Sequence, residues 1–193
     1  MSRALFSASR PLALALTLVC GSLAAVPILH DVAFAQGSWR THKDSKYGYR
    51  VEFPGVPSLS QDTTPGGATM DIARLEAGTT GAFLVISVSG ALDPKTALDA
   101  ATSGALAVGG NQLVSKADLT VDGAPARDLI MRSTETGVTM QIRMVIQGTS
   151  FHQVMAVGAA DAPLEGADRF INSFRLSAPA APAAPGKMAP VAD

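Results

Sequence analysis

The sequence contains a single cysteine, Cys20, among its 193 residues. Cys20 lies in an N-terminal apolar segment that we expect to be removed, so the mature chain would carry no thiol. This absence excludes a disulfide framework, a thiolate metal site and a cysteine nucleophile from the mature protein. A chain of this length buries enough apolar surface to fold without such cross-links.

Charged residues are also scarce, at 16% of the chain against an ordinary value of about 25%. The formal net charge is −1, and removal of Arg3, Arg10 and Asp31 with the N-terminal segment changes it to −2. The sequence has no dense cluster of Lys and Arg of the kind that neutralises a phosphate backbone. We therefore expect no nucleic-acid partner.

Motifs that would identify a catalytic centre or a cofactor site are absent as well. Gly66-Gly67 and Gly109-Gly110 lack the lysine and the hydroxyl residue that follow a phosphate-binding loop. His42 and Asp44 offer only two metal ligands on an expected loop, and the cation Lys43 between them repels a metal ion. We therefore predict no cofactor, no metal site and no catalytic residue.

A hydrolase-like enzyme using Ser150 and His152 is the alternative to a protein without catalytic activity. Ser150, His152 and Asp161 can be combined into a Ser-His-Asp set, because all three fall near one end of the expected sheet. However, the segment 148–152 lacks the closing glycine of a nucleophile elbow. The preferred interpretation of His152 is a histidine that is hydrogen-bonded within the fold or half exposed.

The first 35 residues contain the three parts of a secretory signal peptide in the right order. Arg3 and Arg10 supply the positive charge, an apolar core follows, and Ala33-Phe34-Ala35 is a small-x-small cleavage pattern before Gln36. We predict cleavage between Ala35 and Gln36. The mature protein would then be periplasmic or secreted, with no stable insertion in the membrane.

Two alternatives for this N-terminal segment remain open. The run from Leu12 to Leu29 has 18 residues without a charge, which is near the lower limit for a retained membrane anchor. Cys20 could instead be acylated in a lipoprotein, although the bulky Val19 before it disfavours that processing.

The clearest structural pattern is a β-hairpin from Val138 to Gly158. Its first half alternates apolar residues with polar or smaller ones, which is typical of a strand with one buried face: Val138, Met140, Ile142, Met144 and Ile146. Gly148-Thr149 then forms a two-residue turn with glycine first, as a type II′ turn requires. We expect the Met/Ile face of this hairpin to lie beneath a helix, the one that ends at Phe174.

Further elements are predicted before and after this hairpin. Strands are expected at 49–53, 69–76, 82–89, 111–121 and 125–134, with a turn at 43–46 and a loop at 58–67. Asp93-Pro94 starts one helix that ends at Gly109-Gly110, and Asp161-Ala162-Pro163 starts a second. Five methionines at strand spacing favour core filling over a soft metal site: Met70, Met131, Met140, Met144 and Met155.

These elements predict an α+β fold, in which an antiparallel sheet of about six or seven strands has two helices packed on it. The expected organisation is a signal peptide at 1–35, a lead-in at 36–38, a single domain at 39–176 and a tail at 177–193. The tail has 7 Ala and 4 Pro among its 17 residues. It has no apolar periodicity, so we expect it to be disordered.

Two segments resemble the PsbP-like superfamily of small secreted bacterial α/β domains. The segment 47–54, Tyr-Gly-Tyr-Arg-Val-Glu-Phe-Pro, is similar to the opening strand of that group, which ends in an aromatic-Pro pair. The strand 153–158 and the following helix that ends with 170–174 are similar to its C-terminal half. The sequence departs from the family at His152, where such proteins often have tyrosine. The resemblance implies an α/β/α sandwich and a non-enzymatic accessory or binding role.

The length of the hairpin turn determines which face His152 occupies. With a two-residue turn, Val145 lies opposite His152, so His152 shares a face with Arg143. A three-residue turn would place His152 on the Met144 and Ile146 face instead. We prefer the first arrangement, which makes Arg143 and His152 the candidates for a polar surface site.

The sequence thus predicts a cell-envelope accessory or binding domain without catalytic activity. Its partner would be an unidentified envelope protein or small ligand. The alternatives are the hydrolase-like enzyme and a structural module tethered at the envelope.

Overall fold

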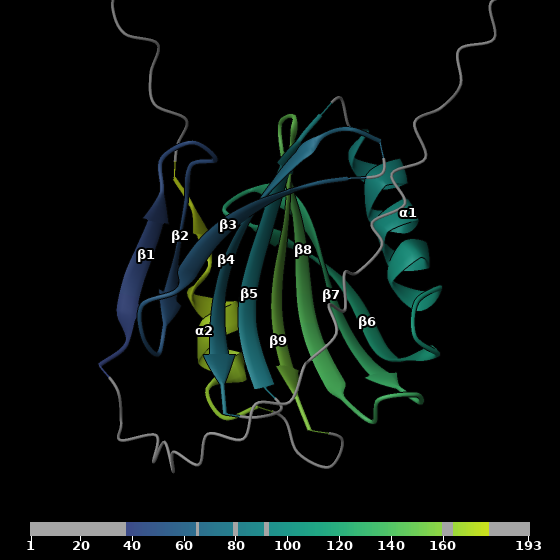
Figure 1. Ribbon diagram of the computed structural model, residues 1–193. Helices are drawn as coiled ribbons and strands as arrows, with labels where there is room; N and C mark the ends of the chain where they lie inside the picture. Colours follow the sequence, from purple (N-terminus) through teal and green to yellow (C-terminus); the bar gives the residue numbers. More distant parts are fainter. Residues whose placement is uncertain (1–37, 65, 79–80, 91–92, 160–163, 178–193) are drawn as a thin grey trace, which may run out of the picture.

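The computed structural model describes residues 38–64, 66–78, 81–90, 93–159 and 164–177. The predicted cleavage site at Ala35 and Gln36 lies outside these residues, as do Cys20 and all but the first residue of the predicted tail. Within the described ranges the chain forms a seven-stranded antiparallel sheet, a three-stranded sheet and two helices (Figure 1). This arrangement confirms the predicted α+β fold class.

The predicted hairpin forms the centre of the large sheet. Strand β8 (Thr139–Gln147) and strand β9 (Ser150–Gly158) are joined by Gly148 and Thr149. Gly148 has a φ of 57°, a backbone conformation that glycine adopts without steric cost. The register pairs Ile146 with Phe151 and Val145 with His152, so the prediction of a two-residue turn is confirmed.

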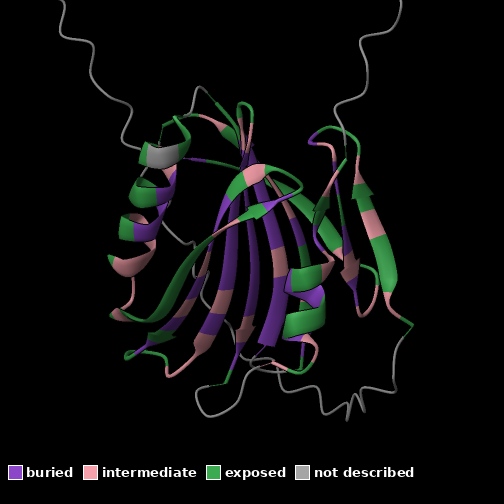
Figure 2. Cartoon of the chain, turned by 180° about the vertical axis from the view of Figure 1, so that it is seen from behind, coloured by how far each residue is buried: buried purple, intermediate pink, exposed green. Residues whose placement is uncertain are grey.

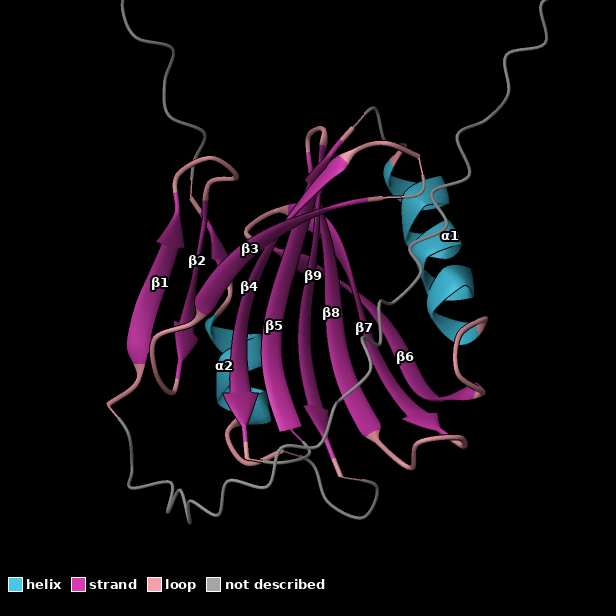
Figure 3. Ribbon diagram, in the orientation of Figure 1, coloured by secondary structure: helices cyan, strands magenta, loops and turns pink. Residues whose placement is uncertain are grey.

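Five further strands complete the large sheet, in the order β3-β4-β5-β9-β8-β7-β6 (Figure 3). They are β3 (Ser58–Thr63), β4 (Thr69–Ala77), β5 (Gly81–Ser89), β6 (Asn111–Val121) and β7 (Ala124–Ser133). The prediction of a loop at 58–67 was wrong over β3, which pairs with β4 along its whole length. All six residues of β3 are exposed. An edge strand of this kind has no buried face and hence no apolar alternation to reveal it.

The small sheet contains β1 (Arg40–Asp44), β2 (Tyr49–Phe53) and β10 (Arg175–Leu176), in the order β1-β2-β10. The turn predicted at 43–46 begins later than expected, because β1 continues to Asp44. His42 therefore lies on a strand and not on the expected loop. Strand β10 has only two residues and is held by pairing with β2, which no local sequence pattern indicates.

The two helices pack on opposite faces of the large sheet. Helix α1 (Pro94–Leu106) begins after Asp93, whose side chain accepts a hydrogen bond from the Thr96 amide, as the sequence predicted. Helix α2 (Ala167–Ser173) and the small sheet cover the other face (Figure 2). Helix α2 begins at Ala167, later than the predicted start at 161–163, which lies outside the described residues. Gly166 precedes α2 with a φ of 81°, and a Cβ atom there would lie 2.6 Å from the Trp39 ring.

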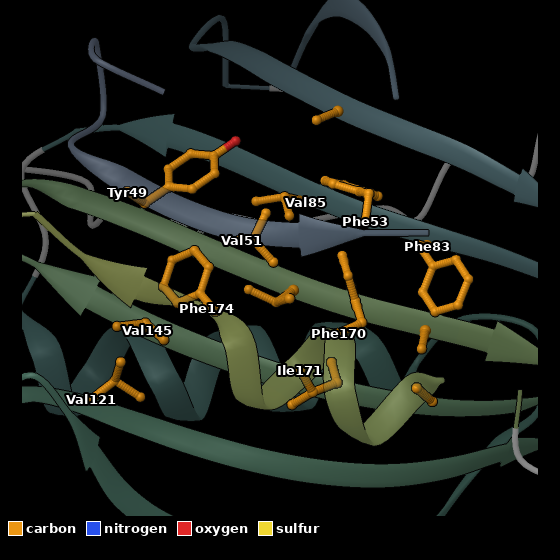
Figure 4. Packing of buried hydrophobic residues seen from close by; sticks show 14 of the residues in the cluster. Tyr49, Val51, Phe53, Phe83, Val85, Val121, Val145, Phe170, Ile171 and Phe174 are labelled. Carbon is orange, nitrogen blue, oxygen red and sulfur yellow. The ribbon is translucent and has the colours of Figure 1, made fainter. Parts of the chain in front are cut away.

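Each face of the large sheet forms its own apolar cluster. Figure 4 shows the cluster under α2 and the small sheet, where Phe53 and Phe83 lie 4.9 and 5.0 Å from the Phe170 ring. The other cluster contains Leu98 and Ala101 of α1 and the five methionines predicted to fill the core. Each of these methionines is at most 6% exposed. The expectation that the Met/Ile face lies beneath the helix ending at Phe174 was therefore wrong, because α1 covers it.

One buried arginine attaches each helix to the sheet. Arg127 of β7 contacts Asp99 and Thr102 of α1, at 2.8 and 3.1 Å, and pairs with Asp118 of β6. On the opposite face, Arg143 of β8 donates a hydrogen bond to the backbone carbonyl of Ile171 in α2, at 3.0 Å. Both interactions satisfy polar groups that burial would otherwise leave unpaired.

Candidate functional site

A cleft lies between the small sheet and the β3–β4 edge of the large sheet. Its volume is about 330 Å³, which is within the size range of small-molecule sites. The wall formed by β1 and β2 carries His42, Asp44 and Tyr49, and the opposite wall is built from residues 59–61 of β3 and 71–73 of β4. We call this feature the interlayer cleft.

Strand alternation brings the two walls together. The register of β3 and β4 pairs Leu59 with Ala73 and Gln61 with Asp71. Ala73 belongs to the apolar cluster under the small sheet, whereas Ile72 packs with the cluster under α1. Because side chains alternate along a strand, Asp71 shares the face of Ala73 and points toward the small sheet.

Tyr49 connects the wall of the interlayer cleft to the core. Its ring is stacked on Phe174 at 5.3 Å and is only 3% exposed (Figure 4). Burial raises the pKa of the Tyr49 phenol well above its usual value, so the phenol stays neutral. The aromatic stack therefore makes this wall a packed surface whose hydroxyl keeps its proton.

Asp71 is the fixed anion of the interlayer cleft. It accepts hydrogen bonds from Lys46 Nζ and Gln61 Nε2, both at 2.5 Å. Burial by itself would raise the pKa of the Asp71 carboxyl, but these hydrogen bonds outweigh it and lower the pKa below its usual value. The Lys46–Asp71 ion pair connects the β1–β2 turn to the large sheet, because Lys46 lies in that turn. Lys46 Nζ also lies 4.8 Å from the centre of the Tyr47 ring.

His42 is a polar group of the cleft with an unused hydrogen-bonding atom. Its ring lies 6.0 Å from both Tyr49 and Phe53. Burial lowers the pKa of His42, although the Asp44 carboxylate acts in the opposite direction. Within the described part of the chain, the buried Nε2 atom of His42 has no hydrogen-bond partner. A neutral imidazole with an unused nitrogen can exchange a hydrogen bond with a bound molecule.

His152 lies deeper than the cleft. It is 0% exposed and is enclosed by the rings of Tyr47, Tyr49 and Phe174, at 6.1, 5.5 and 5.6 Å. Its Nδ1 atom is 3.0 Å from Ser87 Oγ on the neighbouring strand β5. Burial lowers the pKa of His152 to about 4, so the ring is neutral at pH 7.

Arg143 and His152 share a face as predicted, but that face is not a polar surface. Arg143 is 8% exposed and forms a two-point ion pair with Asp128, at 2.7 and 2.8 Å. Helix α2 and the small sheet cover both residues. The prediction of a polar surface site at Arg143 and His152 was therefore wrong, because both residues are buried. The sequence pattern does not show which layer covers this face.

Among the described residues, the serine and histidine of the hypothetical Ser-His-Asp set form no hydrogen bond with each other. His152 Nδ1 lies 3.0 Å from Ser87 Oγ, while Ser150 Oγ lies 3.5 Å from Ser89 Oγ at the end of the strand pair. Asp161 lies outside the described residues. Ser87 is 1% exposed, so the Ser87–His152 pair is buried behind the aromatic layer formed by Tyr47, Tyr49 and Phe174.

Sequence reasoning missed the interlayer cleft itself. Its β3 wall was predicted as a loop, and Asp71 lay within the strand predicted at 69–76 without being a candidate site residue. No local sequence pattern indicates that Gln61 and Asp71 are neighbours, because only the pairing of β3 with β4 brings them together. Among the described residues, no group of three or more potential ligands is arranged to hold a metal ion.

Comparisons with known proteins bear on the fold. No protein-family model matches this chain, and no curated protein matches it. Among solved structures, the solution structure of cyanobacterial PsbP (CyanoP) from Synechocystis sp. PCC 6803 matches with a TM-score of 0.53 and 14% identity. The match covers 81% of this chain and 98% of that chain. The chain has a PsbP-like fold.

The PsbP-like fold confirms the resemblance that segments 47–54 and 153–174 indicated. At 14% identity the match shows the fold alone. A crystal structure of PA94 from Pseudomonas aeruginosa, a protein of unknown function described as a putative regulator, matches with a TM-score of 0.38 and 11% identity over 63% of this chain and 83% of that chain. No helix among the described residues is long and apolar enough to cross a membrane.

Proposed function

We propose that this PsbP-like domain is a non-catalytic binding protein of the cell envelope that holds a small ligand in the interlayer cleft. The observation that carries this proposal is the contrast between two sites. The interlayer cleft is open and is lined by His42, whose Nε2 has no hydrogen-bond partner among the described residues, whereas the Ser87–His152 pair is buried and forms no hydrogen bond with a described carboxylate.

The lining of the cleft indicates the kind of ligand that would bind. Leu59 and Ala73 provide an apolar surface, and His42 and Asp44 provide polar groups on the facing wall. Such a site suits a small amphipathic molecule whose apolar part lies on β3 and β4. Its polar end would form a hydrogen bond with His42. The envelope location rests on the signal-peptide pattern that ends at Ala35.

Filling the cleft tests the proposal. Leu59 lines the cleft and is 68% exposed, while Val56 is 69% exposed and lies outside the lining. Leu59→Trp should occlude the cleft, and Val56→Trp is a control that places the same exposed indole outside the cleft. Native mass spectrometry of the protein isolated from its host should detect a bound small molecule on the wild type and on Val56→Trp, and its loss from Leu59→Trp. Retention on Leu59→Trp, or no bound molecule on any form, would contradict the proposal.

Two further measurements separate the proposal from its alternatives. The wild type should not hydrolyse p-nitrophenyl acetate above the uncatalysed rate, and Ser150→Ala should behave identically. A rate that disappears in Ser150→Ala would favour the hydrolase-like enzyme. The intact mass of the protein from its host should correspond to a chain that starts at Gln36. A mass that includes Cys20, with or without a lipid, would favour the tethered module.

A further inference from the structure

Three cations form a row across the outer face of the small sheet. The register pairs Lys43 of β1 with Arg50 of β2, and Arg50 with Arg175 of β10. Directly opposed residues point to the same face of a sheet, with Cβ atoms about 5 Å apart. Their neighbours Tyr49 and Val51 on β2 are buried, so the three cations point to solvent. Like charges in this arrangement destabilise a sheet, and the fold itself does not require them.

The row borders a hollow between β2 and helix α2. Its volume is about 500 Å³, and the charged residues that line it are Arg50, Arg169, Arg175 and Glu52. Three guanidinium groups against one carboxylate give the hollow a positive charge, although the whole chain has a formal net charge of −1. We call the row and the hollow together the basic face. It is distinct from the interlayer cleft, because the cleft uses inward-pointing residues of β1 and β2.

Two of the arginines are held in place by other groups. Arg169 pairs with Glu52 at 2.8 Å and lies over the Trp39 ring at 4.5 Å. Arg175 Nη1 donates hydrogen bonds to the backbone carbonyls of Asn172 and Phe174, at 2.8 and 2.7 Å. Neither carbonyl neutralises the charge of Arg175.

Lys43 and Arg50 have no ion pair within the described part of the chain. Glu52 is the only carboxylate among the described residues that line the hollow, and it is already paired with Arg169. The basic face therefore presents cations whose positions are partly fixed but whose charge is not compensated. Guanidinium groups in such positions match the two oxygen atoms of a carboxylate.

We propose that the basic face is a docking site for an acidic polypeptide segment of a partner protein. The positive charge of the basic face is complementary to an acidic segment. The shape of the face favours a polypeptide over a membrane surface. None of the large apolar side chains that are exposed in the described chain lies on this face; they are Val56, Leu59, Leu113 and Val114. The basic face therefore has no exposed large apolar side chain that could insert into a bilayer, and a flat bilayer surface would not enter the hollow. A protruding chain with adjacent carboxylates can reach both the hollow and the row.

Charge reversal at Arg50 tests this proposal, because Arg50 belongs to both the row and the hollow. The probe is a fluorescein-labelled oligoglutamate peptide, and its binding to the purified full chain is followed by fluorescence anisotropy at low ionic strength. Arg50→Glu should weaken binding at least about tenfold. Added salt should weaken the wild-type complex, since exposed charges are screened. The control is Lys116→Glu, which makes the same charge change at an exposed position of β6 and should leave binding unchanged.

The possible outcomes separate the proposed partner from other anions. Equal loss of binding in Arg50→Glu and Lys116→Glu would show a general charge effect and overturn the proposal. Binding of inorganic phosphate as tight as that of the peptide would show a small-anion site instead. Preferential binding to vesicles that contain phosphatidylglycerol would show a membrane site. Circular dichroism spectra that match the wild type establish that both variants are folded.

Discussion

Protonation of His152 should destabilise the fold in mildly acidic solution. His152 is fully buried and its pKa is lowered to about 4, from an ordinary value of 6.5. Burial causes this shift, and the Asp44 carboxylate opposes it in part. The other groups that face the ring are the phenols of Tyr47 and Tyr49, the Phe174 ring and the Ser87 hydroxyl, which carry no charge at this pH.

The sign and size of the effect follow from the two pKa values. Between pH 6.5 and pH 4 the unfolded chain binds a proton at His152 that the folded chain does not, so stability falls as the pH is lowered. The contribution is fully present above pH 6.5 and decreases by about 1.4 kcal/mol for each pH unit within this window. Between pH 7 and pH 5 we expect a loss of about 2 kcal/mol in the free energy of unfolding.

Urea unfolding at pH 7 and at pH 5 measures this loss. His152→Phe combined with Ser87→Ala removes the titrating ring and its hydrogen-bond partner together. Ser87 also hydrogen-bonds the Tyr49 hydroxyl, so the stability of each protein at pH 5 is compared with its own stability at pH 7. This double variant should lose much less stability between the two pH values. The pKa of His42 is also lowered by burial, so protonation of His42 contributes to the same loss of stability. The difference between the wild type and His42→Asn in the loss from pH 7 to pH 5 measures this contribution.

A direct titration gives a second readout that does not depend on how the variants fold. The ring protons of His152, followed by NMR in the folded wild type, should titrate with a pKa near 4. A pKa near 6.5 would show that the ring is hydrated and that the aromatic layer does not seal it. An equal loss of stability in the wild type and the double variant would place the acid sensitivity elsewhere in the chain.

Three further predictions concern packing, each measured by urea unfolding. Arg143→Met should destabilise the protein by about 2–4 kcal/mol, because it leaves Asp128 and the end of α2 without their partner. Gly166→Ala should destabilise more than Gly67→Ala, by about 1–3 kcal/mol. Both glycines have a φ above 80°, but only at Gly166 would a Cβ atom meet a ring. Met144→Ala should cost about 2–5 kcal/mol, because Met144 is 0% exposed. A change below about 1 kcal/mol for Arg143→Met or Met144→Ala, or equal effects of the two glycine substitutions, would contradict these assignments.

Local patterns were sufficient to predict the central hairpin and the start of α1. The period of two along β8 and the glycine at position 148 specify both the strand and its turn, and a two-residue turn leaves a single register. Asp93 and Pro94 supply a side-chain cap and a pre-set φ, which are properties of the residues themselves. These predictions were confirmed because they depend on neighbours in the sequence.

Elements that depend on distant partners were not predictable in the same way. Strand β3 is exposed along its length and is defined by pairing with β4, so its residues resemble those of a loop. Strand β10 has two residues and is defined by pairing with β2. Which helix covers the Met/Ile face depends on the path of the chain between the elements. The apolar pattern indicates only that some layer must cover that face.

The candidate site shows the same division. Parity along the hairpin correctly placed Arg143 and His152 on one face, but parity does not show whether a face is covered. The interlayer cleft depends on His42, Gln61 and Asp71, which come from three strands. Only the packing of the small sheet against the large one brings them together.

The sequence by itself determined the fold class, the central hairpin, the cap of α1 and the methionine-rich core, and it favoured the two-residue turn over the three-residue alternative. Each of these follows from the period of the side chains or from the conformational limits of single residues. The tertiary structure alone decided that the Arg143 and His152 face is buried, that α1 covers the methionines, and that a cleft and a basic face flank the small sheet. Burial and contact between distant strands are properties of the packed layers, and no stretch of neighbouring residues encodes them.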